Sequence, residues 1–340
     1  MNKNNILGCL CLALSPSIMA MEALDDKSLS ATTGQDGISL SVDISKVNFK
    51  QAAIIDTDGF SSALTLPEKA ALVMATSPGG PTNIGIDFVQ TFNANGSIQN
   101  SSAELFNAVV DSSKGTGPNG AFNNIALSFG RNVNGFRIRP FSVYLVPNGV
   151  NAISSLVGST YTQQSIFSTG TTLKSTNIKE LLRVNNNIDV KFIANNKPRM
   201  NIQLGSSPQG HLVSFDGAVD SVCASTTAQP NGCSFNLVSG STGAKFDFQM
   251  SGKDANGFSL NGFYMGVESG AGVDPGAVVF GNTGVSDKLN LKINNIWLGD
   301  TIPAASLNPN MLNGLQNGSI GNIGAVGVSA TDLKMRVSGM

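Results

Sequence analysis

Short runs of alternating apolar and polar residues, separated by turn-forming residues, recur along most of this 340-residue chain. In the first, Ile38–Ile44, Ile, Leu, Val and Ile alternate with Ser, Ser and Asp. Such alternation puts apolar side chains on one face of a strand and polar side chains on the other. Because Gly, Asn and Pro interrupt the runs roughly every 8–12 residues, we predict an all-β fold. Its form should be an elongated, mainly antiparallel sheet, sandwich-like or solenoid-like.

A few short helices are expected between the strands. Asn177–Val184 is the clearest candidate, because its first residue can cap a helix and its apolar residues share one helical face. Lys69–Met74 and Leu105–Val110 each follow a Ser/Thr-x-x-Glu capping box. Apolar runs this short are equally compatible with strands, so both structures stay open for these two segments. The last alternating run, Leu333–Val337, predicts that the C-terminal end is tied into a sheet.

The composition excludes two classes of protein. Charged residues make up 13% of the chain and hydrophobic residues 41%, so enough apolar surface exists to offset the entropy of folding, and disorder is not expected. Lys and Arg number 21 and Asp and Glu 22, without a local basic cluster. A nucleic-acid partner, which requires a positively charged surface, is therefore not expected.

Residues 1–20 have the organisation of a signal peptide. A weakly basic start precedes the apolar run Ile6–Leu14, a helix-breaking proline and a cleavage site after Ala20. The apolar run is too short to span a bilayer, and no later run approaches 18 apolar residues. We expect an exported protein without a transmembrane helix in the mature chain.

Removal of the signal peptide would leave two cysteines, Cys223 and Cys233. In the oxidising compartment that export implies, we expect them to form a disulfide across a loop that contains the turn-forming residues Pro230–Gly232. Closing a loop of this length stabilises a fold by about 3 kcal/mol in the chain-entropy model.

The N-terminal motif and first strand occupy residues 21–44, and a β-rich body follows over 45–340, with a subdivision considered near residue 175. In the motif, Asp25 can cap a short helical turn, and Gly34 and Gly37 stand where the chain must reverse before the strand. Leu24 and Leu29 would lie on one side of that turn, which indicates a docking or folding-initiation element.

This N-terminal motif and the glycine-rich ending 318–340 resemble the FilA-like pilus-assembly proteins of Gram-negative bacteria. The resemblance implies an exported, fimbria-associated role with other pilus or envelope-assembly proteins as partners. It brings no catalytic residue with it. The residues that carry the N-terminal match are Leu24, Asp25, Asp26, Leu29, Ser30, Thr33, Gly34, Gln35, Asp36, Gly37 and Ile38.

No catalytic or metal-binding constellation is evident, and no cofactor is expected. The single histidine, His211, cannot form a multi-histidine metal site. Asp56–Gly59 lacks the later ligands of a calcium loop and is interpreted as a turn. Gly115–Gly120 has the spacing of a nucleotide-binding loop but contains a proline and precedes no helix, so a surface loop is expected. Trp297 is interpreted as a core or sheet-surface residue.

We therefore expect a non-enzymatic component of a fimbrial, pilus or cell-surface assembly system, located in the periplasm or at the cell surface of a Gram-negative bacterium. Low charge and extended strands suit assembly through sheet edges. One alternative is a secreted glycan-active or peptide-active enzyme on a β scaffold, which would need paired carboxylates. Its candidate acids are scattered: Asp56, Asp58, Asp216, Asp220 and Asp274. The other alternative is an outer-membrane β-barrel, against which the low aromatic content of 6% argues.

Overall fold

The computed structural model describes residues 37–56, 70–77, 83–101, 104–115, 120–147, 163–164, 172–173, 178–239, 242–270, 276–301, 312–313 and 319–338. The chain divides into two units, residues 1–38 and 39–340, and the strands described below belong to the second, apart from Ile38. All regular elements in the described residues are strands, which confirms the all-β prediction.

The strands fall into eight successive stretches of chain, which we call segments 1 to 8. Segment 1 contains β1 (Ile38–Val42), β2 (Lys46–Phe49) and β3 (Gln51–Asp56), and segment 2 contains β4 (Ala70–Ala75), β5 (Ile84–Phe92), β6 (Ile98–Asn100) and β7 (Phe106–Ser113). Segment 3 contains β8 (Phe122–Phe129), β9 (Gly135–Ile138) and β10 (Phe141–Pro147), and segment 4 contains β13 (Lys179–Val184), β14 (Ile188–Phe192) and β15 (Arg199–Gly205). Segment 5 contains β16 (Val213–Asp216), β17 (Ala218–Val222) and β18 (Cys233–Ser239), and segment 6 contains β19 (Thr242–Gly252), β20 (Phe258–Ser259) and β21 (Phe263–Glu268). Segment 7 contains β22 (Ala277–Asn282) and β23 (Leu289–Thr301), and segment 8 contains β25 (Ser319–Val328) and β26 (Lys334–Ser338). The short strands β11 (Gln163–Gln164), β12 (Thr172–Leu173) and β24 (Leu312–Asn313) lie between segments.

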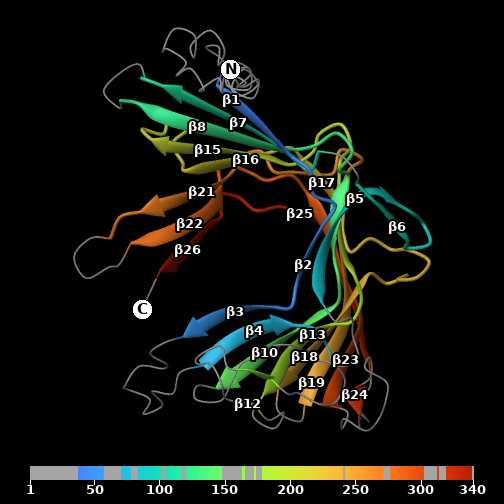
Figure 1. Cartoon of the computed structure of the whole chain (residues 1–340). Coiled ribbons are helices and arrows are strands. Elements are labelled where there is room, and N and C mark those ends of the chain that lie inside the picture. The colour runs from blue at the N-terminus through green and yellow to red at the C-terminus, as the bar shows by residue number, and fades with distance from the viewer. Residues whose placement is uncertain are drawn as a thin grey trace, which may run out of the picture. The chain divides into compact units, whose positions relative to one another are not determined.

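These strands form two large antiparallel sheets (Figure 1). The eight-stranded sheet has the order β1-β7-β8-β15-β16-β21-β22-β26. The sixteen-stranded sheet runs β2-β5-β9-β14-β17-β19-β18-β13-β10-β4-β3, with β6, β20, β23, β24 and β25 attached. Strands β11 and β12 pair separately.

Every segment crosses once between the two sheets, and it keeps the same neighbours in both. Segments 3 and 4, for example, pair as β8 with β15, β9 with β14 and β10 with β13. The two sheets are therefore successive levels of one antiparallel meander in which each segment lies beside its neighbours in sequence. The crossing points, where a segment passes from one sheet to the other, include the described residues 43–45, 101 and 104–105, 130–134, 193–198, 217, 260–262, 283–288 and 329–333.

Hydrogen bonds join neighbouring crossing points to one another. Ala218 N donates to Asn196 O at 2.8 Å, and Leu260 N donates to Gly217 O at 2.8 Å. The Lys197 ammonium donates to Gly130 O at 2.9 Å, and its burial lowers its pKa. These bonds hold the crossing points of successive segments side by side.

Gly217 is the whole crossing point of segment 5, and we expect Gly217→Ala to lower the free energy of unfolding by about 1–3 kcal/mol. Its φ of +86° is strained for any residue with a Cβ, and a Cβ there would lie 2.1 Å from Lys197 O. Gly210→Ala is the matched control, because Gly210 has a φ of +81° but open space around its Cβ position. Urea denaturation measures the free energy of unfolding of both variants. Equal losses would show that the surrounding backbone adjusts and removes the clash between the new Cβ and Lys197 O.

The apolar faces of the two sheets pack together in one aromatic cluster. Phe106 of β7 and Phe129 of β8, from the eight-stranded sheet, contact Phe192 of β14 and Phe88 of β5 from the other sheet. The Phe129 and Phe192 ring centroids are 4.7 Å apart. This sandwich-like contact agrees with the predicted fold class. A second cluster, centred on Ile84, Phe141 and Val184, lies within the sixteen-stranded sheet.

The prediction of a helix over Asn177–Val184 is wrong, because Lys179–Val184 is strand β13. Leu182 pairs with Val143 of β10 on one side and with Leu237 of β18 on the other. The apolar residues of β13 therefore gain partners from two neighbouring strands, which a short isolated helix could not provide. The two ambiguous runs are also strands, β4 and β7, and the described residues contain no helix.

Candidate interaction surface

The first and last segments are the two edges of the meander. We call residues 38–56 the N-terminal edge segment and residues 319–338 the C-terminal edge segment. In the described part of the chain, the N-terminal edge segment pairs only with segment 2, through β1–β7, β2–β5 and β3–β4. The C-terminal edge segment pairs only with segment 7, through β23–β25 and β22–β26. The prediction that the C-terminal strand is tied into a sheet is confirmed.

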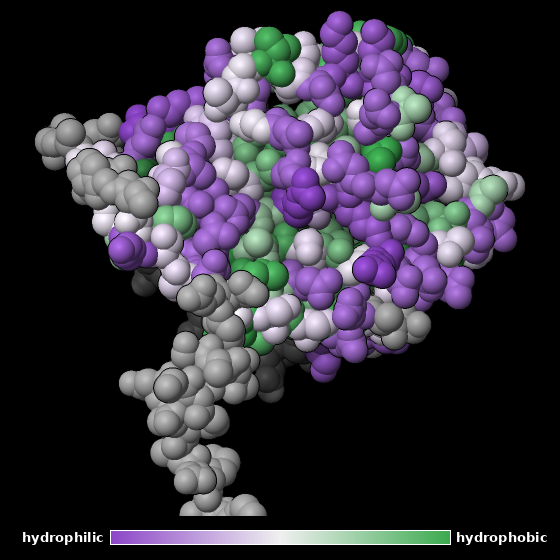
Figure 2. Space-filling model, turned by 90° about the horizontal axis from the view of Figure 1, so that it is seen from above, coloured by the Kyte–Doolittle hydropathy of each residue, from purple (hydrophilic) through white to green (hydrophobic). Residues whose placement is uncertain are grey.

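Apolar side chains are exposed along both edge segments. Among the described residues, the two segments together carry more than half of the large hydrophobic side chains that are exposed, and Ile54 and Val326 reach 76% and 80% exposure. Hydrophobic residues also reach the surface in Figure 2, in the middle of the face seen there, between hydrophilic ones. The exposed residues of the edge segments are Ile38, Leu40, Val42, Ile44, Val47, Ile54 and Ile55, and Ile320, Ile323, Val326, Val328, Leu333, Met335 and Val337.

The two edge segments are only partly protected against pairing with a further strand. Proteins usually protect sheet edges with charged residues, proline or bulges. β1 and β25 contain neither charge nor proline, whereas β2 carries Lys46 and β3 carries Asp56. The cations of β26 are already paired: Arg336 Nε lies 3.1 Å from Glu268 Oε2, and Lys334 also pairs with Glu268, a residue of β21. The register shifts between β23 and β25 are a further protective feature of this edge.

The N-terminal motif reaches the described residues only at its end, where it joins this edge. Gly37 has a φ of +79°, a backbone conformation that favours glycine, and Ile38 begins β1. The other motif residues lie outside the described part of the chain: Leu24, Asp25, Asp26, Leu29, Ser30, Thr33, Gly34, Gln35 and Asp36.

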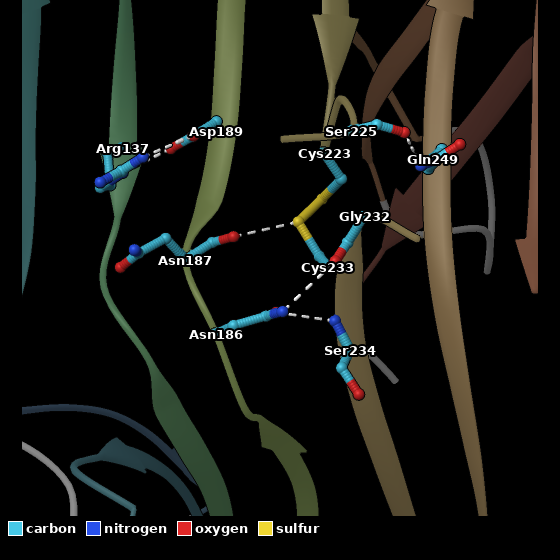
Figure 3. Close-up of a disulfide and its surroundings, with 10 residues drawn as sticks. All are labelled: Arg137, Asn186, Asn187, Asp189, Cys223, Ser225, Gly232, Cys233, Ser234 and Gln249. Atoms are coloured by element: carbon cyan, nitrogen blue, oxygen red, sulfur yellow. Dashed lines mark hydrogen bonds and ion pairs between the residues drawn. A yellow bond between two sulfur atoms is a disulfide. The ribbon is translucent and has the colours of Figure 1, made fainter. Parts of the chain in front are cut away.

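The predicted disulfide between Cys223 and Cys233 is present (Figure 3). It joins the end of β17 to the start of β18 with a Cα–Cα distance of 5.2 Å, and both residues are buried. Asn186 binds the same turn, since its Oδ1 accepts from Ser234 N at 2.7 Å and its Nδ2 donates to Gly232 O at 3.3 Å. The disulfide therefore fixes a bend inside the sixteen-stranded sheet, away from the two edges.

Two ion pairs on neighbouring strands were not predicted. Arg137 of β9 binds Asp189 of β14 through two hydrogen bonds of 2.6 and 2.7 Å, and both side chains are buried. Arg139 binds Asp87 of β5, and this hydrogen bonding raises the pKa of the Arg139 guanidinium. Each pair joins residues 52 positions apart, so only knowledge of strand pairing could have found it.

A pocket of about 500 Å³ opens on the eight-stranded sheet, near His211. The His211 ring stacks on Tyr264 with centroids 3.7 Å apart, and nothing lies within 4 Å of the position of a Cβ on Gly266. Glu268 is the one carboxylate among the lining residues, and it is paired with Lys334 and Arg336. The lining is completed by Gln203, Leu204, Gly205, Ser207, Gly210, Leu212, Val267 and Val279.

The structure does not bring the other candidate residues together. Asp216 pairs with Arg199, and Asp220 accepts a hydrogen bond from Ser221 at 2.7 Å. Asp56 ends β3, while residues 57–59, 116–119 and 274 lie outside the described part. Trp297 is exposed on β23, as a sheet-surface residue. Over the described ranges, no group of three His, Cys, Asp or Glu residues could hold a metal ion, and no helix is long and apolar enough to cross a membrane.

The N-terminal part of the chain is similar to a known protein family. The model of a family of unknown function, DUF6160, matches residues 1–111, which is less than half of the chain. That range takes in the motif and the whole N-terminal edge segment. No curated protein and no solved structure matches the chain.

Proposed function

We propose that this protein is an exported, non-enzymatic component of a fimbrial, pilus or other surface-assembly system of a Gram-negative bacterium. The observation that carries the proposal is the exposure of apolar side chains along the two sheet edges of the described residues, where β1 and β25 have neither charge nor proline. Unpaired edges of this kind add further strands through backbone hydrogen bonds. Exposed apolar surface of this extent also marks a binding surface in a soluble protein.

Three features of the sequence support the cellular setting. Residues 1–20 have the organisation of a signal peptide, and the N-terminal motif resembles FilA-like pilus-assembly proteins. The disulfide is of a kind that persists in oxidising compartments such as the periplasm. The partners proposed are other subunits or assembly proteins of the same system.

The chemistry of the pocket does not favour the enzymatic alternative. Hydrolysis of a glycosidic bond generally requires two carboxyl groups on either side of the bond. Glu268 is the one carboxylate that lines the pocket, and two cations neutralise it. We therefore assign the pocket no reaction.

The proposal is tested by fractionating bacteria that express a C-terminally tagged chain. We expect the protein in the periplasmic or outer-membrane fraction and, where surface filaments are made, in the fraction sheared from the cells. A version that lacks residues 1–20 is the control and should stay in the cytoplasm. Full-length protein confined to the cytoplasm would contradict the proposal. Turnover of glycans or peptides by purified protein, abolished by Glu268→Gln, would favour the enzyme instead.

A further inference from the structure

We infer that copies of this chain add head to tail, the C-terminal edge segment of one copy pairing with the N-terminal edge segment of the next. This inference rests on the proposed function and names the partner at the edges as a second copy of the chain. It would extend both sheets from one copy into the next. The inference follows from strand direction, from the position of the crossing points and from the chemistry of the two edges.

Strand direction makes the two edges compatible. All pairings between neighbouring segments within the chain are antiparallel, as in β2–β5 and β22–β26. Because the segments are even in number, the first and the last run in opposite directions. Placing the last segment of one copy beside the first segment of the next therefore continues the same antiparallel order across the boundary.

The crossing points then fix the level at which the edges meet. Within the chain, neighbouring crossing points are hydrogen-bonded, as in Thr283 N to Gly262 O at 2.9 Å and Gly130 N to Leu105 O at 2.9 Å. The N-terminal edge segment crosses at residues 43–45 and the C-terminal edge segment at 329–333. Aligning these two points puts β26 against β1 and β25 against β2, so each sheet continues into its own counterpart.

The same geometry disfavours pairing between two identical edges. Two N-terminal edge segments could also meet antiparallel, but β1 of one copy would then lie against β2 of the other. The eight-stranded sheet of one copy would have to continue into the sixteen-stranded sheet of its partner. A contact between unlike surfaces that does not close on itself produces an open filament rather than a dimer. This outcome agrees with a role in surface filaments.

The chemistry of the edges favours a second copy over an unrelated partner. β1 and β25 carry no charge, whereas the strands that they would meet, β26 and β2, carry Lys334, Arg336 and Lys46. Both segments expose apolar side chains along most of their length. The two edges are nearly equal in extent, and each contributes to both sheets: β1 with β2 and β3 in the N-terminal edge segment, and β26 with β25 in the C-terminal one. Each edge can therefore pair its backbone hydrogen-bonding groups with those of the other edge, and the apolar side chains of the two edges can bury one another.

Two double variants test the inference, each blocking one edge with lysine at exposed positions. Leu40→Lys with Val47→Lys blocks the N-terminal edge, and Val326→Lys with Met335→Lys blocks the C-terminal edge. We expect purified mature wild-type protein to form a concentration-dependent series of oligomers in analytical ultracentrifugation. Each variant alone should stay monomeric, whereas an equimolar mixture should form dimers and nothing larger, because one good edge of each kind remains.

A control variant and the contrary outcomes make the test decisive. Val267→Lys with Leu237→Lys places the same charges at exposed positions of interior strands and should leave the oligomer series unchanged. Circular dichroism and thermal melting of all variants check that they fold. Dimers formed by either edge variant alone would show like-to-like pairing and overturn the inference. Wild-type protein that is monomeric at every concentration would also overturn it.

The proposed function can fail separately from this inference. Protein found in sheared filaments but monomeric when purified would retain the function and show that another protein covers the edges. Oligomers that form in solution, from a chain confined to the cytoplasm in cells, would retain the head-to-tail pairing and reject the role at the cell surface.

Discussion

Arg137→Ala is expected to lower the free energy of unfolding by about 3–5 kcal/mol, because it leaves a buried carboxylate without its cation. The Asp189 side chain is 4% exposed, and Arg137 binds it through both Nε and Nη2. Arg137 Nη2 also donates to Gly96 O at 2.9 Å, so the substitution removes a third hydrogen bond. Urea denaturation followed by circular dichroism measures the loss.

Arg199→Ala is the matched control for this prediction. Arg199 also pairs with an aspartate on a neighbouring strand, Asp216, but the two side chains are 58% and 38% exposed. Exposed pairs contribute about 0–1 kcal/mol, so the control should unfold almost like wild type. Similar losses in the two variants would mean that water reaches Asp189 and that burial of the pair has little energetic effect.

Replacing both cysteines, Cys223→Ser with Cys233→Ser, is expected to lower the free energy of unfolding by about 3 kcal/mol. The disulfide closes a loop between residues ten positions apart, and without it the unfolded chain regains the freedom of that loop. Thermal melting should show a lower transition for the double variant. Adding a reductant should lower the wild-type transition by a similar amount and leave that of the variant unchanged. A wild-type transition insensitive to reductant would contradict the prediction.

Local sequence patterns were sufficient to predict the all-β class, several of the strands and the disulfide. The alternation in Ile38–Ile44 and Leu333–Val337 corresponds to β1 and β26, in which successive side chains point to opposite faces of the sheet. Burial does not explain this pattern, because all residues of both strands are exposed. The disulfide followed from the number of cysteines and the expected compartment. The prediction of a helix over 177–184 was wrong because its apolar residues also fit between β10 and β18. Local propensity contains no information about such distant partners.

The candidate interaction surface could be predicted only in part. That residues 38–44 and 333–337 form strands was evident, but a local pattern does not show whether a strand lies inside a sheet or at its edge. The position of each edge depends on the lateral order of all the segments. The same holds for Arg137 and Asp189, whose pairing requires β9 and β14 to be neighbours. Such features come from the arrangement of the whole chain.

The order of the meander also determines how the protein can fold as its chain emerges. Because every segment pairs with its sequence neighbours, each new segment finds its template already in place, and no strand has to wait for a distant part of the chain. The loops that these pairings close are long, as between Phe122 and Gly205, but they are shorter than a pairing between the two ends of the chain would require, which lowers their entropic cost. A chain that is delivered N-terminus first can thus grow its sheet one segment at a time. Residues 38–56 act as the initial template, and residues 319–338 are the last to be added.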